Sequence, residues 1–177
     1  MTHLPILIRS SLPYSLVALA VLIVGTNLSY SQKTWDKKAY DEWTAQETLR
    51  ILLDSPWAQF RTERNQSADR PTIIRLRSAL LIRKALVRQK QIYLNYHKFT
   101  AADKSRFNSD VREFLDCSEC TKNYIVTLSS EALTGLRGLS FERVKSFIYL
   151  DNDKGERRPL ARFIPPKSDS VEVMFVF

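Results

Sequence analysis

The sequence predicts an α+β protein in which helices pack on one face of a mostly antiparallel sheet. Helical patterns fill the first half of the chain and strand patterns the second, an order typical of α+β folds. The 177 residues are 44% hydrophobic and 26% charged, which suits a single globular domain. An apolar segment precedes both patterns and predicts an N-terminal signal or anchor helix.

Residues 1–31 are expected to be a signal peptide. The only Lys, Arg, Asp or Glu among them is Arg9, and an apolar run over residues 16–24 follows it. Ser29 and Ser31 have the small-residue spacing that a signal peptidase recognises, which predicts cleavage after Ser31. The apolar run fits a signal peptide and is shorter than the roughly 20 residues of a membrane span.

An uncleaved membrane anchor is the alternative for this segment. Residues 10–32 contain no charged side chain, so a retained helix could contact or cross the membrane through residues 10–28. Both interpretations place residues 33–177 outside the cytoplasm. They form either a small periplasmic or extracellular domain, or the external domain of a single-pass membrane protein.

A capping box predicts the first helix of the exported part. The Thr44 hydroxyl can accept a hydrogen bond from the Glu47 amide, and the Glu47 carboxylate can accept one from the Thr44 amide. Apolar residues follow at helical spacing up to Leu53, and Pro56 ends the helix because it has no amide hydrogen. The polar residues 58–71 are expected to form a surface loop.

The next segments alternate between strand and helix patterns. Residues 72–78 alternate apolar and basic side chains, which predicts a strand. Residues 79–96 have an apolar and a basic side, which predicts an amphipathic helix. Thr100 is expected to cap a further helix, whose apolar stripe begins at Phe107 and extends to Leu115.

The last third of the chain is predicted to be rich in strands. Residues 123–128 form one candidate strand, and residues 129–138 form a short helix or loop. A hairpin is expected next, with a turn at 151–155 that contains Gly155. Its strands are residues 144–150 and 158–164, and residues 171–177 form a final alternating strand.

Two segments resemble a family of uncharacterised bacterial secreted proteins. One is Ile51-Leu52-Leu53-Asp54-Ser55-Pro56-Trp57-Ala58, preceded by Trp43 and the capped helix. The other is Ser78-Ala79-Leu80-Leu81-Ile82-Arg83-Lys84-Ala85, in which Leu81 replaces the proline of the family pattern SALPIRxA. The resemblance implies export and a shared domain, and it implies no activity. Members of the family continue past the position of Phe177, so it also implies a shortened C-terminus.

Basic residues are concentrated between Arg61 and Arg106, where twelve Lys or Arg residues stand against three acidic ones. Such a surplus attracts anionic partners, which outside the cytoplasm are lipid, polysaccharide or acidic envelope proteins. Nucleic acid is disfavoured because aromatic residues are not interleaved with the cations. An ordinary solvated helix face is the alternative. The candidate residues for binding an anionic surface are Arg75, Arg77, Arg83, Lys84, Arg88 and Lys90.

Cys117 and Cys120 form a CxxC motif, and we expect them to be a local disulfide. The motif follows a predicted helix and precedes a strand, the reverse of a thioredoxin site. A zinc site needs four ligands, and only His97 and the distant His3 could add to the two thiols. An oxidising compartment favours the disulfide. No metal or other cofactor is predicted.

The sequence predicts no catalytic residue. His97 is the only histidine of the exported part, and no GxSxG nucleophile motif accompanies it. We therefore expect a non-catalytic envelope or extracellular binding domain whose basic face contacts an anionic partner. The alternative is an envelope enzyme, such as a hydrolase. A pocket in which acidic residues converge on His97 would favour the enzyme, and a flat basic face would favour the binding domain.

Overall fold

The structure is a computed structural model that describes residues 34–65, 68–152, 154–167 and 171–177. The expected signal or anchor segment, residues 1–31, lies outside the described residues. Within the described part, no helix is long and apolar enough to cross a membrane. The α+β class is confirmed, because helices pack with a sheet in which every described strand pairing is antiparallel.

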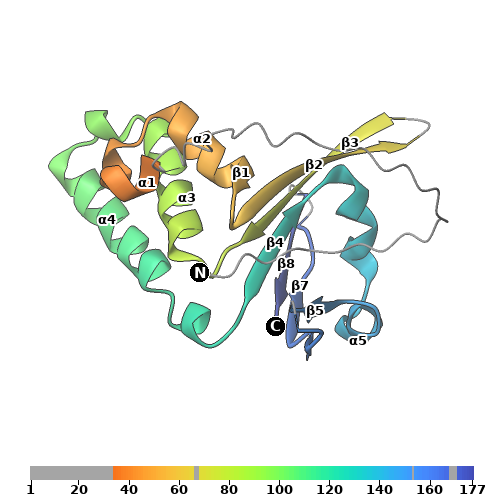
Figure 1. Cartoon of the computed structure of the whole chain (residues 1–177). Helices are drawn as coiled ribbons and strands as arrows, with labels where there is room; N and C mark the ends of the chain where they lie inside the picture. Colours follow the sequence, from red (N-terminus) through yellow and green to blue (C-terminus); the bar gives the residue numbers. More distant parts are fainter. Residues whose placement is uncertain (1–33, 66–67, 153, 168–170) are drawn as a thin grey trace, which may run out of the picture.

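The main sheet has six strands in the order β1-β2-β3-β4-β8-β7 (Figure 1). The C-terminal strand β8 therefore lies inside the sheet, between β4 and β7. Two further strands, β5 and β6, form a separate hairpin. The strands are β1 (Asp54–Ser55), β2 (Ala58–Asn65), β3 (Ala68–Leu76), β4 (Ile125–Ser129), β5 (Tyr149–Asp151), β6 (Arg157–Pro159), β7 (Arg162–Ile164) and β8 (Glu172–Val176).

The expected loop at 58–71 is wrong, because these residues form most of a long hairpin. Strands β2 and β3 pair from Ala58↔Arg75 to Asn65↔Ala68. The pairing of β3 with β4 stops at Ile73↔Ser129, so the outer part of the hairpin projects beyond the sheet (Figure 1). Strand β2 is defined by its backbone pairing with β3, and the polar composition of the segment did not reveal that pairing.

Four of the six described helical segments of the first half contribute to or adjoin one hydrophobic core. The six are α1 (Thr34–Lys37), η1 (Tyr40–Glu42), α2 (Ala45–Leu53), α3 (Leu80–Tyr93), η2 (Tyr96–Lys98) and α4 (Ala101–Asp116). The four at the core are α1, η1, α2 and α3. The capping box of α2 is confirmed, with the Glu47 amide 3.2 Å from Thr44 Oγ1 and the Thr44 amide 2.8 Å from Glu47 Oε2. Thr100 caps α4 by accepting from the Asp103 amide at 3.2 Å. This core contains the fully buried Trp43, Ile51, Leu52 and Ile82.

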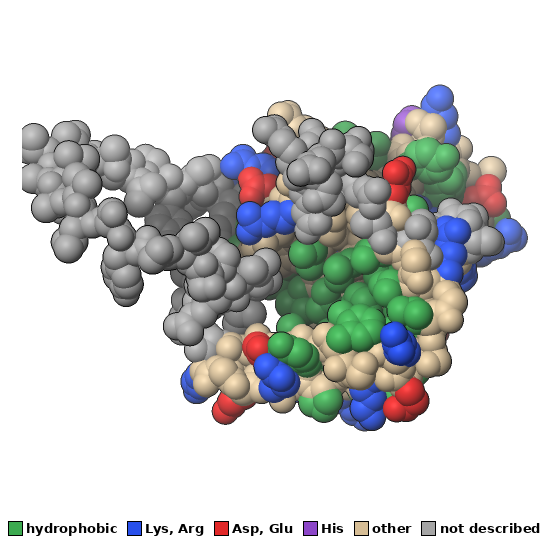
Figure 2. Space-filling view, turned by 90° about the vertical axis from the view of Figure 1, so that its right-hand side faces the viewer, with side chains coloured by type: hydrophobic (Ala, Val, Ile, Leu, Met, Phe, Trp, Pro, Cys, Tyr) green, Lys and Arg blue, Asp and Glu red, His purple; other side chains and the backbone are tan. Residues whose placement is uncertain are grey.

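A second core lies between the sheet and the segments η4 (Glu131–Gly138) and α5 (Phe141–Lys145). The remaining short segment, η3 (Ser118–Thr121), follows α4. Val173 and Phe175 of β8 contribute to the second core together with Val144 of α5, while several apolar residues of η4 and α5 are only partly buried. Figure 2 views the side on which η4 and α5 lie in Figure 1 and shows hydrophobic side chains gathered there in a hollow, with cations at its border.

The segment 144–150 was expected to be a strand, and the structure divides it between α5 and β5. The helix begins after Ser140, whose hydroxyl accepts from the Arg143 amide at 3.3 Å. The expected turn at 151–155 does join a hairpin, because Asn152 Oδ1 accepts from the amides of Lys154 and Glu156. Gly155 lies in this turn with a φ of 76°, a backbone conformation that glycine adopts without strain.

The helices cover both faces of the sheet and not one alone. Arg75 Nε donates to Leu52 O at 2.9 Å, so α2 lies on the face of β3 toward which Arg75 points. Leu76 points to the opposite face and pairs with Val126, which packs in the second core with Val144 of α5. The α+β class is therefore confirmed, and the expectation that the helices pack on one face of the sheet is wrong.

Candidate functional site

Three of the six predicted binding cations donate to backbone carbonyls of the protein itself. Arg75 Nε donates to Leu52 O at 2.9 Å, and Arg88 Nε donates to Trp43 O at 2.7 Å. Burial is the main factor that lowers the pKa of Arg75 below its usual value, opposed by the nearby carboxylate of Glu172. The Nε donors of both guanidinium groups are thus used within the fold and join separate elements, so neither side chain belongs to a freely exposed basic face.

Arg83 is the most strongly engaged of the six. Its side chain is 6% exposed. Nε and Nη2 donate to Leu115 O at 3.2 and 3.1 Å, and Nη1 donates to Ser78 O. Burial, and then the positive charge of Arg77, lower the pKa of the Arg83 guanidinium. Arg83 thus connects the end of β3, the start of α3 and the end of α4.

The other three cations do not complete an exposed stripe. Arg77 lies over the ring of Phe114, 5.1 Å from its centroid, and Lys84 is half-buried. Lys90 is exposed and lies 5.7 Å from the centroid of Phe107. The structure therefore does not bring the six predicted residues together as one basic surface, because most of them point into contacts with the protein.

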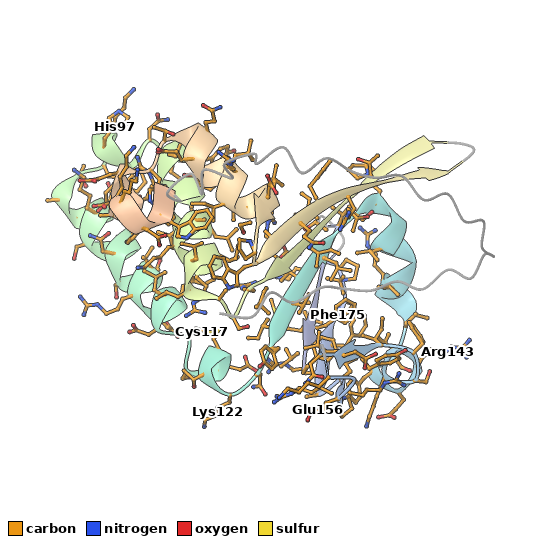
Figure 3. The ribbon with its side chains drawn as sticks, viewed as in Figure 1. His97, Cys117, Lys122, Arg143, Glu156 and Phe175 are labelled. Atoms are coloured by element: carbon orange, nitrogen blue, oxygen red, sulfur yellow. A yellow bond between two sulfur atoms is a disulfide. The ribbon has the colours of Figure 1, made fainter. Side chains whose placement is uncertain are left out.

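Cys117 and Cys120 are joined by a disulfide with a Cα–Cα distance of 5.3 Å. Cys117 ends α4 in the left-handed region, with a φ of 30°. The pair then encloses the start of the single turn η3, which leads into β4. The disulfide fixes the point at which the chain leaves the helical half and enters the sheet. Figure 3 shows Cys117 and Lys122 at this junction, well separated from His97 at the outer end of the helices.

A hollow of about 370 Å³ lies beside this disulfide, and we call it the disulfide pocket. Its walls come from the β1–β2 turn, the end of β3 and the β3–α3 connection, η3 and the η3–β4 connection, and β6. The residues that shape its chemistry are Trp57, Ser78, Lys122, Asn123, Tyr124 and Arg158. Sequence analysis missed it, because these side chains are up to 101 residues apart and only the nearby CxxC motif indicated this region.

The disulfide pocket is positively charged. Lys122 and Arg158 are its only charged lining residues within the described part of the chain, and both are exposed. The Arg158 guanidinium lies 4.9 Å from the centroid of the Tyr124 ring, which holds it near the opening. The nearest acidic residue along the chain, Glu119, forms an ion pair with Arg162. The pocket thus offers two cations and two aromatic rings to a ligand.

A larger hollow of about 620 Å³ lies between η1, α3, η2 and α4, and we call it the helical cleft. It contains His97 together with the carboxylates of Asp41 and Asp116. The cations Arg88 and Arg112 also line it, so its formal charges balance when His97 is neutral. His97 is exposed, and none of the described lining residues is Ser, Thr or Cys.

Metal ligands do not gather at either hollow. Within the described ranges, no group of three or more His, Cys, Asp or Glu residues is placed to hold a metal ion. What both hollows offer chemically is charge, hydrogen-bond donors and aromatic rings. No family model, no curated protein and no solved structure matches this chain.

Proposed function

We propose that this chain is an exported, non-catalytic binding domain that holds an anionic partner at the disulfide pocket. The partner belongs to the chemistry expected from the sequence, an acidic polysaccharide or an anionic lipid surface. Export rests on the apolar run over residues 16–24 and on the resemblance of residues 43–58 and 78–85 to bacterial secreted proteins. The disulfide is consistent with an oxidising compartment.

One observation carries the proposal: the disulfide pocket presents Lys122 and Arg158 with no acidic residue among its described lining side chains. Two cations around one hollow produce a local positive potential that attracts anions. The rings of Trp57 and Tyr124 add apolar contact area beside the charges. We propose the disulfide pocket in place of the basic face expected from the sequence, because Arg83 of that face is buried against backbone carbonyls.

The test measures binding of the full chain to anionic and neutral partners. The anionic partners are polygalacturonate and phosphatidylglycerol vesicles, and the neutral ones are dextran and phosphatidylcholine vesicles. We expect the anionic partner to bind, and we expect salt to weaken it because exposed charges are screened. Equal binding to the neutral partner, or binding that salt does not change, contradicts the proposal.

Paired substitutions locate the site. The variant with both Lys122→Gln and Arg158→Gln is expected to bind about 30-fold more weakly, since each cation near an anionic surface contributes about 1 kcal/mol. The matched control replaces Arg143 and Lys154, two exposed cations of the same half of the fold that do not line the disulfide pocket. Equal losses in both double variants would assign binding to diffuse charge and refute the pocket.

N-terminal sequencing of the protein recovered from fractionated cells tests the export step. A first residue of Gln32 in the envelope or medium supports the signal peptide, and an intact N-terminus in the membrane fraction supports the anchor. An intact N-terminus in the cytosol with reduced Cys117 and Cys120 contradicts export.

A hydrolase acting in the helical cleft is the second candidate function. The observation in its favour is that His97 shares this cleft with Asp41 and Asp116. A general base near a carboxylate is a common catalytic pair, but it needs a nucleophile or an activated water within reach. Ester or glycoside hydrolysis by the full chain that His97→Asn abolishes would establish this function in place of the binding domain.

A further inference from the structure

The helical cleft is built by side chains from four separate segments. Asp41 comes from η1, Arg88 and Gln91 from α3, His97 from η2, and Arg112 and Asp116 from α4. Its volume of about 620 Å³ is within the range of about 300–1,000 Å³ that is typical of small-molecule sites. The cleft is therefore large enough for a ligand of several residues or rings.

The guanidinium of Arg88 is held in place at the wall of this cleft. Its Nε donates to Trp43 O at 2.7 Å and its Nη1 donates to Gln91 Oε1 at 3.3 Å. Gln91 is 6% exposed, so its amide is a fixed part of the wall. A guanidinium has five N–H donors, and these two contacts use two of them. Arg88 is thus positioned before a ligand arrives, which reduces the entropy that binding costs.

Two tyrosines give the cleft a second fixed wall. The Tyr96 hydroxyl donates to Asn108 Oδ1 at 2.9 Å, and its ring packs against Phe99 and Phe107 with centroid distances of 5.5 and 5.1 Å. Burial, and then the negative charge of Asp41, raise the pKa of Tyr40, so its hydroxyl keeps its proton near neutral pH. Both phenols can exchange hydrogen bonds with a polar ligand.

The charges of the cleft distinguish it from the disulfide pocket. Two arginines and two aspartates line one hollow, and neither sign is in excess. A polyanion would meet Asp41 and Asp116, and a polycation would meet Arg88 and Arg112, so each would be repelled by part of the wall. A ligand that carries one carboxylate and one ammonium group complements both pairs.

We propose that the helical cleft binds a short peptide with unblocked termini. Arg88 and Arg112 bind its terminal carboxylate, and Asp41 and Asp116 bind its terminal ammonium group. Arginine suits the carboxylate because its planar donors match the two oxygens. The tyrosine wall and Asn108 supply hydrogen bonds to the peptide groups between the ends. This site is independent of the anionic partner proposed for the disulfide pocket.

The test is calorimetric titration of the full chain with trialanine. N-acetyl-trialanine amide has the same backbone without either terminal charge, and maltotriose is a neutral polar ligand of comparable size. We expect trialanine to bind and the other two to bind at least tenfold more weakly, since charge-assisted hydrogen bonds at both ends are lost. Equal binding of the blocked peptide, stronger binding of maltotriose, or no binding of trialanine overturns the proposal.

Matched variants on α4 locate the binding. Arg112→Gln and Asp116→Asn alter the cleft, whereas Arg106→Gln and Asp110→Asn alter exposed residues of the same helix that do not line it. All four positions are exposed, so the variants should retain the circular dichroism spectrum of the wild type. We expect about tenfold weaker trialanine binding in the first two and no change in the controls. Equal effects in both pairs refute the site, and the Lys122/Arg158 variant should bind trialanine normally.

Discussion

Replacing Arg83 with methionine is predicted to destabilise the fold and to leave anion binding unchanged. The substitution keeps an unbranched apolar side chain about as long as the aliphatic part of arginine and removes the guanidinium. Arg83 is 6% exposed, and its donors contact Leu115 O and Ser78 O, carbonyls that come from α4 and from the end of β3. Methionine offers no donor to either carbonyl, so both acceptors lose their partner.

The expected loss follows from these contacts. A hydrogen bond from a charged donor contributes about 1.5–3 kcal/mol, and an unsatisfied buried acceptor costs about 1–3 kcal/mol. Part of this is offset because the cost of burying the Arg83 charge, which lowers its pKa, also disappears. We therefore expect a net decrease of about 3 kcal/mol in the free energy of unfolding. Arg83→Lys should lose nearly as much, because an ammonium group cannot span both carbonyls.

Urea unfolding followed by tryptophan fluorescence measures this decrease, since the chain has three tryptophans and Trp43 is buried in the first core. With a slope of about 2 kcal/mol per molar urea, the midpoint should fall by about 1.5 M. The control is Lys90→Met, which removes an exposed cation from the same helix and should shift the midpoint by less than about 0.3 M. Equal midpoints for both variants, together with weaker polygalacturonate binding by Arg83→Met, would refute the structural role and restore Arg83 as a binding residue.

Two further predictions concern the ends of the helices. Replacing both Cys117 and Cys120 with serine should lower the free energy of unfolding by about 2 kcal/mol, a modest loss because the disulfide closes a short loop with a sequence separation of 3. Calorimetry should show a melting temperature about 4–8 °C lower. An unchanged melting temperature would contradict this prediction. The pKa of Glu47 lies below its usual value of 4.5, first because of the hydrogen bond from Lys38 and then because of the one from the Thr44 amide. The folded state thus favours the ionised form of Glu47, so its contribution to stability is present above about pH 4.5 and is lost as the pH falls through the folded pKa. Glu47→Gln should therefore be less stable than the wild type at about pH 7 and equally stable at about pH 2. A difference in stability that persists in acid would contradict this prediction.

Local signals in the sequence predicted the helix boundaries well. Thr44 and Thr100 each precede a helix and each accept the hydrogen bond that a capping residue is expected to accept. A cap acts between residues three apart, so no knowledge of the tertiary fold is needed to recognise it. The same holds for the turn at 151–155, where Asn152 accepts from amides two and four residues later.

Segments whose structure depends on distant partners could not be predicted in this way. Residues 58–65 form a strand because they pair with residues 68–75, and this pairing is not indicated by a repeat of apolar residues in the segment itself. Residues 144–150 contain Val144, which belongs to a helix, and Leu150, which belongs to a strand. Both side chains pack against the second core, so an apolar pattern alone could not separate the two elements.

The candidate site illustrates a more general difficulty with counting charges. Arg75, Arg83 and Arg88 lie in the most basic part of the sequence, yet all three donate to backbone carbonyls of the protein. A carbonyl acceptor carries no signature in the sequence, because every residue has one. Part of the surplus of cations between Arg61 and Arg106 therefore serves to join elements of the fold by hydrogen bonds and does not indicate a binding surface.

The same reasoning indicates where binding should be sought. A buried cation such as Arg83, whose donors end on carbonyls of its own fold, contributes to stability, whereas an exposed cation near a hollow and an aromatic ring remains available to a ligand. Lys122 and Arg158 meet this condition, although they are 36 residues apart and lie outside the most basic segment. They come together because Arg158 of β6 lies over the ring of Tyr124, which directly precedes β4, an arrangement fixed by the fold as a whole. Substituting them should therefore change binding with little effect on stability, the reverse of the result expected for Arg83.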